Sequence, residues 1–167
     1  MPLRALRLGL AVLLLSACGL VDGDDAANEK DVFPGSISVG LPQIGAIDPP
    51  RAASPSALTL IRTACDQLTG TDADTGMPAP TLAAKWTFAP GATKLSIRLR
   101  AARFQDGSAV TAEAVREALS RVARPSTASP WAPLVSRVAG FPEVQSQAAT
   151  NLSGIKITGR NALEIQL

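Results

Sequence analysis

The amino-terminal apolar run is the feature that most constrains this chain, because it decides which residues belong to a folded body at all. Arg4 and Arg7 precede a stretch over residues 8–15 in which every side chain is apolar or glycine. A basic start, a short apolar run and small residues after it are typical of a cleaved export signal. The run is shorter than the roughly 20 residues that a membrane-spanning helix needs. We therefore expect residues 1–17 to be removed.

The four residues that close this run form a second signal. Leu15-Ser16-Ala17-Cys18 resembles the lipobox of bacterial lipoproteins, in which a diacylglycerol is attached to the cysteine thiol and the chain is cut just before it. The resemblance implies that Cys18 is the lipid attachment site and that the protein is anchored to the cell membrane on its extracytoplasmic side. The alternative is an ordinary signal peptide that happens to contain a cysteine.

Removal of the signal changes the charge of the chain. The whole sequence holds 16 Lys and Arg against 14 Asp and Glu, but residues 18–167 hold 14 of each. We find no basic patch of the kind that nucleic acid binding needs, so no nucleic acid partner is expected. Residues 19–31 contain five acids, one base and few large apolar groups. Such a segment buries too little surface to fold, which predicts a flexible tether over residues 18–35.

The second cysteine has two interpretations. The chain has only two cysteines, so a lipid on Cys18 leaves Cys65 without a partner in this sequence. An unpaired cysteine outside the cytoplasm is either a small buried hydrophobe or half of a disulfide, here to a cysteine beyond Leu167. Both interpretations stay open at this point.

Strand and helix patterns alternate after the tether. Alternating apolar residues predict a strand over residues 36–41, and the prolines that follow predict a loop over residues 42–54. Ser54 before Pro55 is a typical helix start, and the spacing of Leu58, Ile61, Cys65 and Leu68 predicts an amphipathic helix that ends before Gly70, with its apolar stripe in the core. A polar turn over residues 71–76, followed by two prolines, indicates a reversal of the chain.

The second half of the chain predicts two hairpins and a helix. Residues 85–88 and 94–100 alternate as a hairpin with one buried face, which places Arg98 and Arg100 toward solvent rather than in a ligand clamp. A helix is expected from Thr111 to Pro125, and a short helix over residues 131–138. Residues 155–157 and 163–167 predict a second hairpin, which we expect to expose a strand edge. Because the chain stops inside the last strand, we expect a truncated product.

Several of these residues carry a family resemblance. The segments Pro80-Thr-Leu-Ala-Ala-Lys-Trp86, Leu95 to Arg100, Phe104-Gln-Asp-Gly107 and Val110-Thr-Ala-Glu-Ala-Val115 are similar to the family 5 extracellular solute-binding proteins. That family includes the oligopeptide, dipeptide, nickel and glutathione receptors of ABC importers. Ala114 departs from the aspartate usual in the pattern, no Lys-Gly pair follows Arg100, and Cys65 stands where an aromatic residue is common.

The resemblance implies an α/β chain with the N-terminal part of a bilobal, class II periplasmic-binding-protein-like fold. It implies that residues 36–81 start the first lobe and that residues 82–167 form a β-rich subdomain inserted in it, incomplete here. The implied partners are a peptide or other small solute, ABC permease subunits and the membrane, through the lipid on Cys18. Most ligand contacts would lie beyond Leu167, so no ligand-binding residue is assigned. The loop over residues 42–54 is the segment expected to face the solute.

The sequence contains few of the residues and motifs that enzymes use for catalysis. The chain has no histidine, which excludes histidine bases and histidine metal ligands, and it has no Walker or GxGxxG motif. We therefore expect a protein that is not an enzyme and that has no cofactor, metal or catalytic site. The alternatives are a solute receptor that feeds a sensor system, a lipid-anchored enzyme whose site lies elsewhere, and an inactive truncated gene product.

Overall fold

The computed structural model describes residues 37–167, of which Leu41–Leu167 form one compact unit. The expected signal peptide, Cys18 and the tether lie outside the described residues. We expected a strand over residues 36–41. This expectation was wrong for residues 37–41, which are not in a strand, and Ile37 and Val39 are 89% and 71% exposed. A strand needs a neighbouring backbone for its N–H and C=O groups, and no described segment pairs with this one.

The first helix begins where the sequence indicated but ends early. After the 3₁₀ helix η2 (Pro49–Arg51), α1 (Pro55–Ala64) starts with Ser54 as its cap and Pro55 in its first position. The backbone carbonyls of residues 67 and 68 accept hydrogen bonds from the amides of residues 82 and 83, so the chain is extended there instead of helical. Cys65 therefore lies outside the helix and is exposed, and its assignment to a buried stripe was wrong.

A small two-stranded sheet follows α1. Strand β1 (Thr69–Thr71) pairs in antiparallel fashion with β2 (Pro78–Pro80). The turn between them is closed by the Asp72 carboxylate, which accepts from the Thr75 amide at 2.8 Å and from the Thr75 hydroxyl at 2.7 Å. The expected reversal is thus confirmed. The pattern did not predict the strands, because proline lacks an amide donor and is confined to strands with a free edge.

The main sheet combines both expected hairpins. Its strand order is β3-β4-β6-β5, formed by β3 (Ala83–Phe88), β4 (Lys94–Leu99), β5 (Ile155–Gly159) and β6 (Ala162–Gln166), with a 3₁₀ turn η3 (Pro90–Ala92) after β3. All neighbours are antiparallel. The last strand, β6, lies between β4 and β5, and the edges of the sheet are β3 and β5. The second hairpin therefore exposes a strand edge as expected, on β5.

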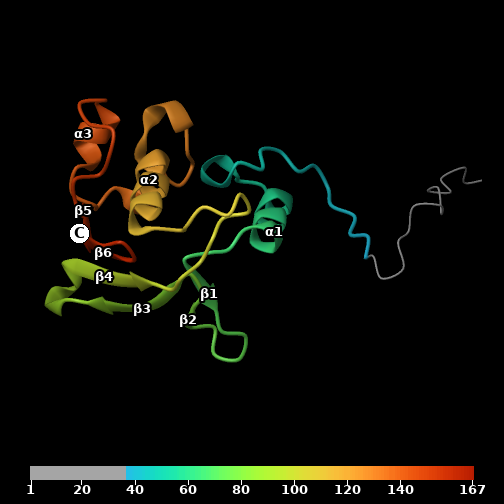
Figure 1. Cartoon of the computed structure of the whole chain (residues 1–167). Coiled ribbons are helices and arrows are strands. Elements are labelled where there is room, and N and C mark those ends of the chain that lie inside the picture. The colour runs from blue at the N-terminus through green and yellow to red at the C-terminus, as the bar shows by residue number, and fades with distance from the viewer. Residues whose placement is uncertain (1–36) are drawn as a thin grey trace, which may run out of the picture. The chain divides into compact units, whose positions relative to one another are not determined.

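Short helices cover the apolar face of this sheet (Figure 1). They are α2 (Ala112–Ala123), η4 (Pro125–Thr127), η5 (Ala132–Val135) and α3 (Phe141–Gln145). Thr111 caps α2 by accepting from the Ala114 amide at 3.2 Å, and the helix ends before Pro125 as expected. The helices and the sheet share one core, whose least exposed large side chains are Leu152, Leu163 and Val144. Among the described residues, no helix has both the length and the apolar character needed to cross a membrane.

Candidate functional site

Polar contacts fix the loop over residues 42–54, which the sequence resemblance expects to face a solute. One contact is local: the Ser54 hydroxyl donates to the Ile44 carbonyl oxygen, while its oxygen accepts from the Ala57 amide at 3.1 Å. Two other contacts reach the helical layer, across 73 and 79 residues of sequence. We call the four residues of these two contacts the loop clamp: Asp48, Ala52, Arg121 and Trp131.

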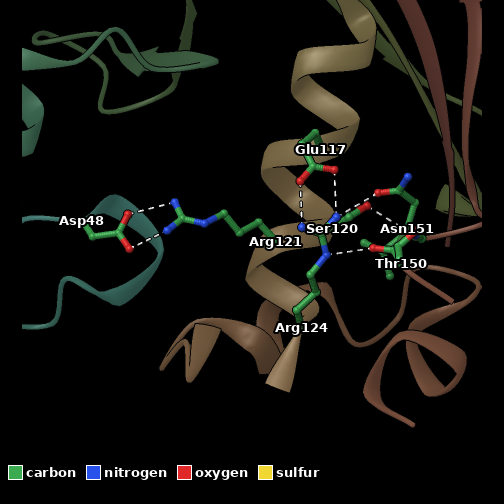
Figure 2. Close-up of polar contacts among 8 residues, drawn as sticks. Asp48, Glu117, Ser120, Arg121, Arg124, Thr150 and Asn151 are labelled. Carbon is green, nitrogen blue, oxygen red and sulfur yellow. Dashed lines mark hydrogen bonds and ion pairs between the residues drawn. The ribbon is translucent and has the colours of Figure 1, made fainter. Parts of the chain in front are cut away.

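The first arm of the loop clamp is an ion pair between Asp48 and Arg121 of α2. The two terminal nitrogens of Arg121 donate to the two carboxylate oxygens of Asp48 at 2.9 and 2.7 Å (Figure 2). The backbone carbonyl of Asp48 also accepts from the amides of Arg51 and Ala52 at 2.8 and 2.9 Å, which starts η2. Because a planar guanidinium meets both carboxylate oxygens, this pair fixes the orientation of the loop as well as its distance from α2.

The second arm of the loop clamp holds the other end of η2. The indole nitrogen of Trp131 donates to the carbonyl oxygen of Ala52 at 2.7 Å. Ala52 is fully buried, so its carbonyl needs a partner inside the protein. The indole supplies that partner. The two arms together attach residues 48–52 to the helical layer at both ends of one turn.

The carboxyl-terminal half of α2 holds a second segment on its other side (Figure 2). Arg124 donates to both oxygens of Glu117 at 2.7 and 2.8 Å and to the Thr150 carbonyl at 2.9 Å. The amide of Leu152 donates to the buried Ser120 hydroxyl oxygen at 3.0 Å. As a result, one helix fixes the expected solute-facing loop and the segment that leads into β5.

The charges of this network favour its ionised form. The hydrogen bond from Arg124 lowers the pKa of Glu117, an effect that desolvation opposes and that the positive charges of three nearby arginines reinforce. The same hydrogen bond raises the pKa of Arg124. Both groups are therefore charged at neutral pH, and the bidentate contact between Arg124 and Glu117 is kept at that pH.

The surface of the described residues includes two open hollows, and neither of these two holds a recognisable set of catalytic groups. One, of about 520 Å³, is lined mainly by small residues together with Arg103 and Arg160. The other, of about 330 Å³, includes Cys65, whose thiol is free among the described residues. The interpretation of Cys65 as a small buried hydrophobe was wrong because the residue is exposed. Its disulfide to a later cysteine stays a prediction.

The aromatic-Gln-Asp-Gly segment of the sequence pattern forms a tight turn. The Asp106 carboxylate accepts from the Ser108 amide at 2.8 Å and from the Ser108 hydroxyl at 2.6 Å, and these bonds lower the pKa of Asp106. Gly107 has a φ of +83°, a backbone conformation that favours glycine. The segment is explained by its structural role. No cluster of three or more His, Cys, Asp or Glu side chains suited to a metal occurs in residues 37–167.

Sequence reasoning expected the loop but missed the clamp. Asp48 lies in the loop expected over residues 42–54, and Arg121 lies near the end of the helix expected from Thr111 to Pro125. The sequence carries no signal that joins these two residues, which are 73 positions apart. Arg98 and Arg100 are exposed, which confirms their expected direction. Cys18 lies outside the residues that the structure describes.

Comparisons with known proteins agree with this architecture. A family model described as bacterial extracellular solute-binding proteins, family 5 middle, matches residues 77–167, more than half of the chain. The structure of Listeria monocytogenes OppA bound to peptide is 25% identical and has a TM-score of 0.66, over 75% of this chain and 25% of that one. The peptide-binding pheromone receptor PrgZ is 29% identical, with a TM-score of 0.65 over 72% of this chain and 24% of that one.

A third structure shares the fold at lower identity. The murein tripeptide binding protein MppA of Escherichia coli is 23% identical and has a TM-score of 0.64, over 73% of this chain and 24% of that one. The chain thus spans about a quarter of the length of these three structures. No curated protein matches it. From its family match and its mixed α/β structure, which matches part of the periplasmic-binding-protein-like fold, this chain belongs to the bacterial extracellular solute-binding proteins of family 5.

Proposed function

We propose that this chain is part of a receptor that captures peptides or similar small solutes outside the cytoplasmic membrane and delivers them to the permease of an ABC importer. The observation that carries the proposal is the family match over residues 77–167. The likeness to OppA bound to peptide supports peptides as the solute class. Binding and release need no bond chemistry, so the proposed role is that of a receptor and not of an enzyme.

The proposal places the receptor at the membrane surface. Residues 1–17 would direct export, a lipid on Cys18 would anchor the protein, and residues 18–35 would form the tether. Residues 36–81 would then start the first lobe of the receptor, with residues 82–167 as the subdomain inserted in it. The support for this arrangement is the order of basic, apolar and small residues before Cys18 and the composition that follows it.

The loop clamp has a defined place in this proposal. A loop that contacts solute binds more tightly if its bound conformation already exists in the free protein, because less conformational entropy is lost on binding. The loop clamp holds residues 48–52 by contacts that need no solute. It would therefore preorganise the expected solute-facing loop from the helical layer behind it.

Uptake of labelled peptides by cells tests the proposal. A strain that lacks the gene should take up less of a labelled mixture of di- to pentapeptides than the parent strain, and the gene in trans should restore uptake. Equal uptake in the two strains would contradict the importer role. In a separate calorimetric titration, residues 36–167 alone should show no micromolar affinity for the same peptides, since a closing cleft needs two lobes.

One comparison supports a second candidate function. PrgZ is described as a pheromone receptor, so a member of this fold can serve signalling. If this chain serves a sensor system, deletion should leave peptide uptake unchanged and abolish a peptide-dependent change in transcription. Measuring both responses in one strain separates the two candidates. Neither response would be affected if the chain were an inactive gene product.

A further inference from the structure

The main sheet has a second face, opposite the helical layer. Along β4, Leu95, Ile97 and Leu99 belong to or pack on the core, so the alternate residues point the other way. The strand register places the corresponding residues of β3, β5 and β6 beside them. We call this the outer sheet face, and its residues are Lys85, Thr87, Lys94, Ser96, Arg98, Lys156, Ala162, Glu164 and Gln166.

The outer sheet face concentrates the positive charge of the described residues. It holds four basic side chains and one acid, Glu164, whereas residues 37–167 as a whole hold 13 basic and nine acidic side chains. The face thus accounts for three of the four net positive charges. All three lysines in this part of the chain lie on it. The charge is therefore gathered on one surface instead of being spread over the molecule.

Two of these cations face each other without a counter-ion. Lys85 and Arg98 are direct partners across β3 and β4, both are exposed, and neither forms an ion pair with any described residue. Like charges directly opposite each other on antiparallel strands destabilise the sheet. Folding alone does not account for this arrangement. An anionic partner outside the sheet would remove the repulsion.

The single acid of the face is already neutralised. Glu164 accepts from Lys94 at 3.1 Å and from Ser96 at 3.3 Å. The hydrogen bond from Lys94 lowers the pKa of Glu164 most, and the charge of Lys156 adds to the effect. Glu164 is ionised at neutral pH and is occupied by Lys94. Lys85, Arg98 and Lys156 remain as exposed cations for an external partner.

The surface is polar, which bears on the kind of partner that fits it. Ala162 is its only apolar side chain, and none of its residues lines the two hollows described above. Figure 1 shows α2 and α3 on the opposite side of the sheet. Protein interfaces have an apolar or aromatic centre, which this face lacks. Cations on β3, β4 and β5, in a sheet whose neighbouring strands lie about 4.8 Å apart, instead suit an extended anionic surface.

We propose that the outer sheet face docks onto the anionic phospholipid headgroups of the membrane to which the protein is tethered. The inference rests on the proposed function, because export and a lipid on Cys18 would bring the face to that membrane. Residues 18–40 can span at most about 80 Å, so the folded unit stays near that membrane. Each Lys or Arg near such a surface raises the docked-to-undocked ratio roughly fivefold. The attraction falls off within about 8 Å at physiological salt.

Lysine acylation of the full chain on vesicles tests the docking. The chain is bound through its own amino terminus to phosphatidylglycerol or to phosphatidylcholine vesicles, and the acylation rate at Lys156 is read by mass spectrometry. Acylation should slow several-fold on phosphatidylglycerol at 0.1 M salt. It should recover at 1 M salt, where the screening length falls to about 3 Å, and on phosphatidylcholine.

Matched variants distinguish an effect of the outer sheet face from an effect of the protein's net charge. Lys85→Gln with Arg98→Gln should lower the docked-to-undocked ratio about 25-fold and remove the protection of Lys156. The control, Arg62→Gln with Arg137→Gln, removes the same charge from two exposed arginines that form no ion pair with a described residue, and should leave the protection unchanged. The first variant should also melt no earlier than wild type, because it removes a repulsion.

Other outcomes would overturn the proposal. Equal protection on both lipids would mean that headgroup charge is not recognised, and protection without vesicles would mean that protein covers the face. Equal loss of protection in the control would mean that only total charge matters. If the double variant fails to fold, Lys85→Gln alone carries the test, with an expected fivefold effect. Because no peptide is used, failure of this test leaves the uptake experiment unaffected, and the reverse also holds.

Discussion

Replacing Asp48 by asparagine should loosen the loop over residues 42–54 while the rest of the unit stays folded. Asparagine has nearly the same shape as aspartate, but it has no charge and only one oxygen that can accept from Arg121. The variant therefore keeps at most one of the two hydrogen bonds of 2.9 and 2.7 Å. The second arm of the loop clamp, from Trp131 to Ala52, remains.

The solvent exposure of Asp48 and Arg121 sets how much their ion pair stabilises the loop. The side chains of Arg121 and Asp48 are 47% and 32% exposed, so water and salt screen much of their attraction. Exposed pairs contribute about 0.2–1 kcal/mol, and bidentate geometry places this pair near the upper end. We expect the free energy of opening the loop to fall by about 1 kcal/mol, which speeds amide exchange in the loop roughly fivefold. The same loss corresponds to a fall in melting temperature of only about 2–5 °C.

Hydrogen exchange with mass spectrometry measures this change directly. The amides of Arg51 and Ala52, which bond the Asp48 carbonyl, should exchange faster in the variant, and amides of the main sheet should not change. Glu113→Gln is the matched control, because the ion pair of Glu113 is with Arg116 on the same helix and does not involve the loop. Unchanged exchange at residues 51 and 52 in Asp48→Asn would refute the reasoning, as would equal acceleration in the control.

The remaining predictions address backbone, pH and anchoring. Gly140→Ala should destabilise the fold by several kcal/mol more than Gly107→Ala. Both glycines have positive φ, but a Cβ at Gly140 would lie 2.5 Å from a backbone nitrogen, whereas one at Gly107 meets no atom within 4 Å. Denaturant titration of both variants therefore separates the steric clash from the backbone strain. The lowered pKa of Glu117 implies a contribution to stability that is complete above the ordinary pKa of 4.5 and is lost as the pH falls through the folded pKa. Glu117→Gln should therefore be less stable than wild type at pH 7, and the difference in stability should shrink in melts at acid pH. An equal difference at both pH values would contradict the assignment. Cys18→Ser should move the protein out of the membrane fraction of labelled cells while export continues, and an unchanged fraction would exclude the lipid anchor.

Local patterns in the sequence predicted much of this fold. The hairpins followed from strict alternation around residues such as Ile97 and Leu163, which fixes the buried face of each strand. The helix starts followed from Ser54 and Thr111, whose hydroxyl oxygens accept hydrogen bonds from amides only three residues away. These features depend on neighbours along the chain, which is why a single sequence is enough to predict them.

Features that depend on distant partners were not predicted. The end of α1 is set by residues 82 and 83, whose amides bond the carbonyls of residues 67 and 68. The loop clamp joins residues 73 and 79 positions apart, and each of its members has an adequate local explanation. The place of β6 between β4 and β5 also depends on a pairing that no turn dictates. A hairpin pattern specifies its own two strands but not which strand of another hairpin they join.

The central position of β6 has a kinetic consequence. The β3–β4 hairpin leaves the ribosome or the export pore first, and the inner edge of β4 then waits for partners that are about 70 residues further along. At synthesis rates of 5–20 residues per second, the wait is roughly 3–14 s, far longer than a hairpin needs to form. Throughout that interval Leu95 and Ile97 lie in a strand that has one unpaired edge, open to association with other chains. Folding yield should therefore depend on how fast the last strand is delivered.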